Sequence, residues 1–302
     1  MARPSLGTLA SFFVRTRVLG QRRPLLASFK LTYRCNLTCP ACPFHLRADR
    51  GPAHITWEKA VQSLDELKRM GCRIVIFEGG EPLTWRDGAH TFDDLCAYAR
   101  SLFLCVGATT NGTRMLKADT DVLWVSLDGT KASHDRLRCG TYDVVMTNLR
   151  ASVHPRLYVH YTLNRENWRD FPLAMAQIMT IPHVKGITVQ FFYPYGQGEA
   201  DLALDRHARA EAVATLIRLK EAGYPILNSR GRLEAMLDNT WRCHDWLLAN
   251  VEPDGRISTG CYVRGRGEVN CAACGFTPVA EASGAYDLRP GAILAGWRIF
   301  LE

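Results

Sequence analysis

Three cysteines lie within eight residues of one another, directly after a mostly apolar run. Residues 25–31 (LLASFKL) are typical of a buried strand, and the loop that leaves it reads CNLTCPAC. Soft thiolate ligands select iron–sulfur clusters or zinc, and three thiolates leave one corner of a cluster open. An open metal position can bind a substrate or a cofactor. The loop therefore predicts a reactive metal centre held by Cys35, Cys39 and Cys42.

A second motif follows one expected helix and one expected strand. The helix, residues 56–70, should begin at Thr56 and end at Gly71, and the strand follows at residues 73–77. The strand runs directly into EGGEP. Two glycines permit a close backbone approach to a ligand, and the carboxylate of Glu81 can receive an ammonium group.

The remaining pattern is an alternation of strands and helices as far as about residue 222. Six strands that alternate with helices predict a parallel sheet, and polar motifs follow several strands at their carboxyl ends. Further strands are expected at residues 104–109, 122–127, 157–164 and 186–192, and further helices at 92–102, 170–179 and 205–222.

The C-x3-C-x2-C spacing and the GGEP segment together resemble the radical S-adenosylmethionine (SAM) superfamily. Over about residues 25–200 the resemblance implies a partial (β/α)6 TIM-type barrel. It also implies a [4Fe-4S] cluster on three cysteines, with SAM bound to the fourth iron. Reduction of SAM would yield a 5'-deoxyadenosyl radical that abstracts hydrogen from a substrate. The implied SAM contacts are Gly79, Gly80, Glu81, Asn111, Ser126 (in an SLDG segment), Arg138 and Thr162.

This sequence departs from the family pattern before the third cysteine. That position is often aromatic in the family and is Ala41 here, so Phe44 is expected to cover the adenine instead. Cys139 lies near the expected SAM-binding loop and is the candidate hydrogen-atom donor.

Four more cysteines form a second group near the carboxyl end. Asp254 and Gly255 are a strong turn signal and predict a β-hairpin within the group. Four thiolates with a C-x2-C pair make a closed site for a [4Fe-4S] cluster or for structural zinc. The layout resembles the SPASM or twitch extension of radical SAM enzymes, which implies one auxiliary [4Fe-4S] cluster. Its ligands would be Cys243, Cys261, Cys271 and Cys274.

Length and composition are those of a soluble globular protein with one large α/β domain and a small appendage. The chain has 302 residues, 47% of them hydrophobic and 22% charged. Its eleven cysteines form short-spaced groups, which favours metal ligation in a reducing cytoplasm over a disulfide scaffold. The net charge of +7 is concentrated in residues 1–50, with nine basic residues against one acidic residue. A charge confined to one segment does not indicate a nucleic-acid-binding protein.

The basic amino-terminal segment, residues 1–24, is expected to contain an amphipathic helix at residues 5–20. It is too short and too charged to span a bilayer. Either it covers the bottom of the barrel, or it lies on anionic lipid at the inner membrane face. We expect the barrel over residues 25–225 and the auxiliary domain over residues 226–302, with a short helix in the tail.

Three functions are compatible with these observations. SPASM-type enzymes commonly modify peptides, so the resemblance favours hydrogen abstraction from a peptide or protein, with electrons from a reductase or a flavodoxin-type donor. The basic amphipathic segment favours, as an alternative, a lipid or isoprenoid substrate at the membrane surface. The third possibility is that the protein is not an enzyme but a zinc-binding module, although a zinc site requires neither the GGEP nor the SLDG segment.

Overall fold

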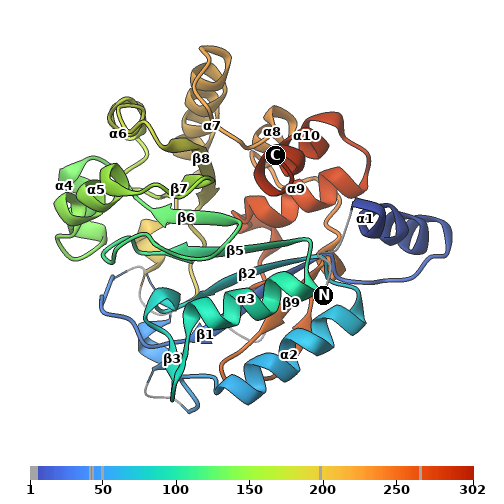
Figure 1. Cartoon of the computed structure of the whole chain (residues 1–302). Helices are drawn as coiled ribbons and strands as arrows, with labels where there is room; N and C mark the ends of the chain where they lie inside the picture. Colours follow the sequence, from blue (N-terminus) through green and yellow to red (C-terminus); the bar gives the residue numbers. More distant parts are fainter. Residues whose placement is uncertain (1–5, 41, 43, 49–50, 197–198, 265–266) are drawn as a thin grey trace.

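One eight-stranded sheet forms the centre of the computed structural model, which describes residues 6–40, 42, 44–48, 51–196, 199–264 and 267–302 (Figure 1). The strand order is β10-β9-β1-β2-β5-β6-β7-β8. Neighbours from β9 to β8 are parallel, and β10 is antiparallel to β9. The strands are β1 (Leu26–Thr32), β2 (Ile74–Gly79), β5 (Cys105–Thr110), β6 (Val122–Ser126), β7 (Leu157–Leu163), β8 (Val184–Phe191), β9 (Leu248–Val251) and β10 (Ile257–Thr259). A two-stranded ribbon, β3 (Arg86–Asp87) with β4 (His90–Thr91), stands apart.

Helices cover the outer face of the six strands from β1 to β8, and the predicted partial barrel is confirmed (Figure 1). The expected helix at residues 56–70 is α2, where the Thr56 side chain caps the first turn and Gly71 ends the last turn at φ 108°. Two short helices between β6 and β7 were not anticipated. These outer helices are α2 (Trp57–Met70), α3 (Phe92–Leu102), α4 (Lys131–Leu137), α5 (Tyr142–Ala151), α6 (Phe171–Ile178) and α7 (Arg206–Glu221).

The strands separate two apolar layers because successive side chains point to opposite faces of the sheet. On β6, Leu123 and Val125 pack outward under the helices, whereas Trp124 points into the barrel. Gly107 on the neighbouring strand makes room for this ring, since a Cβ there would stand 2.7 Å from it. The lumen is therefore partly filled by aromatic side chains and remains open beyond them.

The carboxyl-terminal part extends the same sheet. The predicted hairpin forms β9 and β10, and β9 pairs in parallel with β1, so that Phe29 is opposite Val251. The tail, expected as one short helix, contains two. The helices of this part are α8 (Arg230–Ala235), α9 (Thr277–Tyr286) and α10 (Pro290–Phe300).

The amino-terminal segment packs beside the tail. Its expected helix is α1 (Leu6–Phe13), which continues into the π-helical turn η1 (Val14–Val18). Phe12 is buried, and the Tyr286 hydroxyl donates to the Thr16 carbonyl at 3.2 Å. Among the described residues, no helix has the length and apolar character needed to cross a bilayer.

Candidate cluster and cofactor site

The three clustered cysteines line one end of a cavity of about 450 Å³ that extends into the barrel. They lie on the loop after β1, at the carboxyl end of the strands, where parallel α/β folds place their sites. Cys35 accepts hydrogen bonds through its sulfur from the Leu37 amide at 3.4 Å and from Asn111 Nδ2 at 3.6 Å. Ala41 lies in this loop but outside the described residues.

Burial of the loop favours the neutral form of its thiols in the absence of a metal. The pKa of the Cys39 thiol is raised to about 12, mainly by burial; the nearby Arg138 opposes the rise, and Cys139 and Cys42 add to it. A bound metal reverses this preference because it stabilises the thiolate form. Within the described part of the chain, no three His, Cys, Asp or Glu side chains already stand together as a metal site. The donor type and its convergence on one cavity fit a three-cysteine iron–sulfur cluster.

The two glycines of the GGEP segment hold β2 against the cysteine loop. Gly79 has φ 129°, and a Cβ at this position would lie 2.2 Å from the Thr32 carbonyl oxygen. A Cβ on Gly80 would lie 2.0 Å from the Arg34 carbonyl oxygen. The Gly80 amide donates to the Thr32 carbonyl at 2.6 Å. The close approach that the two glycines permit is therefore to the backbone that leads into the cysteine loop. Both glycines also line the cavity.

Glu81 is fully buried and lies behind the cavity wall. Its carboxylate accepts hydrogen bonds from Thr110 Oγ1 at 2.8 Å, from the Asn111 amide at 2.7 Å and from the Leu83 amide at 3.1 Å. Burial raises its pKa and the hydrogen bonds oppose this rise. The structure thus gives Glu81 a role in joining β2 to β5, and its contact with a cofactor ammonium stays a prediction.

The other predicted SAM contacts surround the cavity. Asn111, Ser126 and Thr162 follow or end the adjacent strands β5, β6 and β7, and all three line it. Thr162 Oγ1 accepts from Gln190 Nε2 at 3.3 Å. Phe44 also lines the cavity and stacks on Tyr33 with ring centroids 5.8 Å apart, so the adenine contact expected of it remains a prediction.

Arg138 lines the cavity and is held by an ion pair with Asp128, a residue that the sequence analysis did not assign to the site. Its Nε donates to Asp128 Oδ2, while Asp128 Oδ1 accepts from the Thr162 amide at 2.7 Å. Asp128 therefore orients the guanidinium and also joins β6 to β7. A carboxylate at the end of a strand with an arginine ten residues later is the sequence signal for this pair.

Cys139 lies beside the cysteine loop without lining the cavity, as far as the described residues show. It is exposed, has φ 58°, and its sulfur is 4.0 Å from Thr38 Oγ1. Its role as a hydrogen-atom donor stays a prediction.

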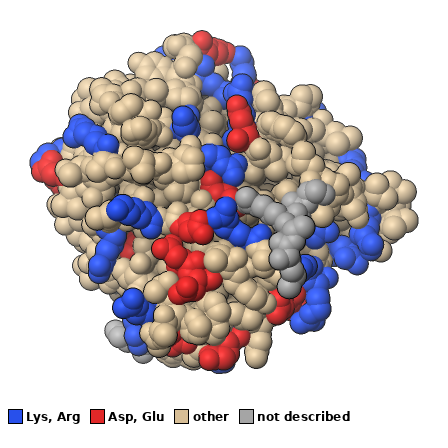
Figure 2. All heavy atoms as spheres, viewed as in Figure 1, with Lys and Arg blue, Asp and Glu red and all other residues tan. Residues whose placement is uncertain are grey.

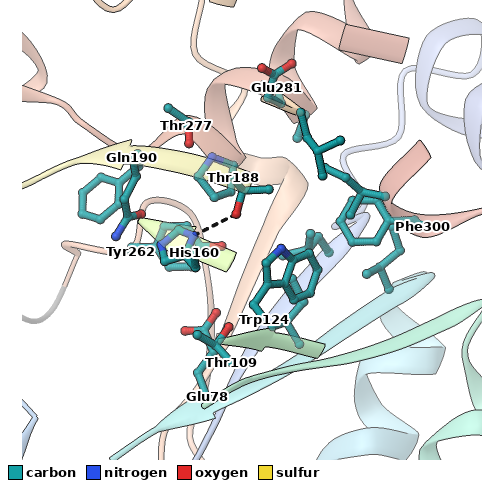
Figure 3. Close-up of a pocket in the computed structure, with 18 of the residues that line it drawn as sticks. Glu78, Thr109, Trp124, His160, Thr188, Gln190, Tyr262, Thr277, Glu281 and Phe300 are labelled. Atoms are coloured by element: carbon teal, nitrogen blue, oxygen red, sulfur yellow. Dashed lines mark hydrogen bonds between the residues drawn. The ribbon is translucent and has the colours of Figure 1, made fainter. Parts of the chain in front are cut away.

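Polar side chains deep in the lumen were also missed. Lys30 is fully buried, 3.6 Å from the Glu78 carboxylate and 5.3 Å from the centre of the Tyr262 ring. His160 points into the same cavity and contacts Thr188 Oγ1 at 3.0 Å (Figure 3). Burial lowers the pKa of His160, which favours the neutral imidazole. The alternation of side chains along the strands could have identified these residues, because they occupy the inward-facing positions.

The four carboxyl-terminal cysteines lie near enough to one another to interact electrostatically, although they are not gathered as a preformed metal site. The pKa of the Cys243 thiol is raised to about 12, first by burial and then by Asp245 and the other three cysteines. Cys271 opens a short 3-10 turn that the Asn270 side chain caps, and Cys274 ends it. Four thiols in one region form a donor set that suits a tetrathiolate metal site.

Comparisons with known proteins indicate the family to which the chain belongs. The family profile "Radical SAM superfamily" matches residues 29–178. The chain is 25% identical to Fe-coproporphyrin III synthase of Methanosarcina barkeri, over 68% of this chain and 54% of that protein. It is 28% identical to mycofactocin maturase MftC of Mycobacterium tuberculosis, over 83% of this chain and 62% of that protein. The chain thus spans less than two thirds of the length of these curated relatives.

The fold agrees as well. Streptococcus suis SuiB bound to the precursor peptide SuiA superposes with a TM-score of 0.65 at 15% identity, over 90% of this chain and 68% of SuiB. The chain belongs to the radical SAM superfamily of enzymes. A [4Fe-4S] cluster and SAM are the cofactors of this superfamily, and the cysteine end of the cavity offers thiol donors of the kind that such a cluster needs.

Gly80→Ala tests the contact that joins the GGEP segment to the cysteine loop. The added methyl group would overlap the Arg34 carbonyl, so we expect a loss of at least about 3 kcal/mol in unfolding free energy. Gly231→Ala in α8 is the control, because open space surrounds it and alanine favours the helix by about 1 kcal/mol. Urea unfolding of both proteins measures the difference, and equal stability would contradict the role of Gly80.

Proposed function

We propose that the protein abstracts a hydrogen atom from a C–H bond of a peptide or protein substrate held in the barrel. The observation that carries this proposal is the continuity of one cavity. The same cavity is lined by the three cysteines at one end and by Trp124 and Phe276 farther in. A substrate group that enters the lumen would therefore lie next to a cofactor bound at the strand ends.

The bound cluster would supply the electron that cleaves SAM to a 5'-deoxyadenosyl radical, the reaction typical of the superfamily. The residues of this chain bind and orient the reactants. Cys35, Cys39 and Cys42 hold the metal, and Arg138 offers a fixed guanidinium to a carboxylate. Phe44 and the polar strand ends complete the pocket for the nucleoside.

The apolar lining of the lumen protects a reactive radical. Trp124, Tyr262 and Phe276 are buried aromatic side chains of the cavity wall, and they exclude water from the space beyond the cysteines. The neutral His160 and Glu78, which pairs with the buried Lys30, are among the polar groups of the wall that could meet polar atoms of the substrate there, together with Gln190 and Glu281. They would orient the substrate so that one C–H bond faces the cofactor.

We further propose that the four carboxyl-terminal cysteines hold an auxiliary [4Fe-4S] cluster. Its ligands Cys243 and Cys271 are exposed, which suits electron exchange with a reductase or a flavodoxin-type donor. The names of relatives and structural neighbours support a peptide substrate, since they include PqqA peptide cyclase and SuiB bound to a precursor peptide.

A second candidate substrate is a lipid or isoprenoid. The cavity continues to the opposite end of the barrel, where Leu9 and Phe13 of α1 and Trp297 of α10 line it. This lining would accommodate a long apolar chain. Relatives that are named for haem synthesis make a tetrapyrrole a further outcome to be tested.

Two cysteine variants separate the two metal sites. After anaerobic reconstitution, Cys35→Ala should lose about four irons per chain and all SAM cleavage, because a cubane needs its three ligands. A variant with Cys271 and Cys274 changed to Ala should also lose about four irons yet still cleave SAM with dithionite. Retention of all iron in the second variant, or zinc in place of iron in the parent protein, would contradict an auxiliary iron–sulfur cluster.

Deuterium transfer identifies the substrate class even when the substrate itself has not been isolated. Peptide, lipid and tetrapyrrole fractions are prepared from cells grown in D2O, and each is incubated with the reconstituted protein, dithionite and unlabelled SAM. We expect mass spectrometry to find deuterium in 5'-deoxyadenosine with the peptide fraction. Label from the lipid or tetrapyrrole fraction alone would overturn the peptide assignment, and Cys35→Ala is the control for enzymatic origin.

A further inference from the structure

Two segments that are far apart in the sequence expose apolar side chains on one end of the barrel. The first contains α1 and η1, and the second is α10 (Figure 1). The first segment contacts α9, the helix that precedes α10, through Tyr286, whose ring lies 5.0 Å from the Arg17 guanidinium. The exposed apolar residues are Leu6, Val14, Val18, Leu19, Ile293, Leu294 and Trp297. We call these seven residues the apolar face.

Basic residues border the apolar face. Residues 6–24 contain four arginines and no acidic residue: Arg15, Arg17, Arg22 and Arg23. Figure 2 shows Lys and Arg side chains beside the otherwise uncharged α1 end of the molecule. Long arginine side chains can place their guanidinium groups at the level of lipid headgroups while their stems contact apolar surface.

The apolar face is continuous with the catalytic cavity. Ile293 and Trp297 belong to both, and Leu9 and Phe13 line the cavity from the α1 side. Trp124 inside the barrel lies with its ring centroid 6.0 Å from that of Phe300 on α10 (Figure 3). A largely apolar passage, with Glu281 among its lining residues, thus connects the exposed face with the interior.

We propose that the apolar face and its four arginines form a docking surface for an anionic lipid bilayer. Apolar side chains enter the boundary between headgroups and acyl chains, and each arginine near an anionic surface contributes about 1 kcal/mol. Asp and Glu are absent from residues 6–24, so this part of the surface complements anionic headgroups. The proposal is independent of the peptide assignment, since it concerns where the protein works and not which bond it attacks.

Sedimentation with vesicles tests the docking surface on the full, reconstituted protein. Vesicles contain phosphatidylcholine alone or a mixture with phosphatidylglycerol. We expect binding to the mixed vesicles, with at least a tenfold loss in Val18→Glu, because the new charge repels the surface and removes an apolar contact. Val153→Glu is the matched control: Val153 is 78% exposed and Val18 is 75% exposed, but Val153 follows α5.

Each outcome decides the proposal. Binding that Val18→Glu and Val153→Glu reduce equally, or no binding to mixed vesicles, overturns it. Self-association that is lost in Val18→Glu without vesicle binding assigns the face to a second copy of the chain instead. Quenching of tryptophan fluorescence by brominated lipid should fall in Trp297→Phe. Dithionite-driven SAM cleavage without vesicles should be unchanged in Val18→Glu, which separates a failure of docking from a failure of the proposed chemistry.

Discussion

The close backbone contact between the two glycines after β2 and the start of the cysteine loop is the constraint on which the site depends. Gly80 meets the Arg34 carbonyl with no room for a side chain, and its amide donates to Thr32. One residue later the buried Glu81 carboxylate accepts a hydrogen bond from the Asn111 amide, directly after β5. Three neighbouring strands are thereby held in register at the edge where the three thiols converge.

The two ends of the cavity differ in polarity, which suits them to different ligands. The carboxyl edge carries thiols, amides, hydroxyls and the Arg138–Asp128 pair, which suit a charged cofactor. Below it the lining is largely aromatic and aliphatic, although Gln190 and Glu281 also line it. The buried Lys30 pairs with Glu78 and lies over the Tyr262 ring. A radical formed at the upper level would meet apolar substrate atoms and little water at the lower level.

Much of this arrangement could be predicted from the sequence. The strand and helix periods indicated the partial barrel, and motif positions at strand ends indicated the site because parallel strands end at one edge. The helix α4 was missed because it has only seven residues, whereas α5 was missed although its ten residues are amphipathic. The partnership of Asp128 with Arg138 and the packing of β9 beside β1 were missed because tertiary contacts decide them.

Low-temperature EPR of the dithionite-reduced, reconstituted protein, recorded with and without SAM, tests the central claim most directly. The account predicts a [4Fe-4S] signal that shifts when SAM is added, because SAM would coordinate the iron that Cys35, Cys39 and Cys42 leave open. The shift should be absent from Cys35→Ala, while any auxiliary signal persists. A spectrum that SAM does not change, from protein that retains zinc in place of iron, would contradict the account.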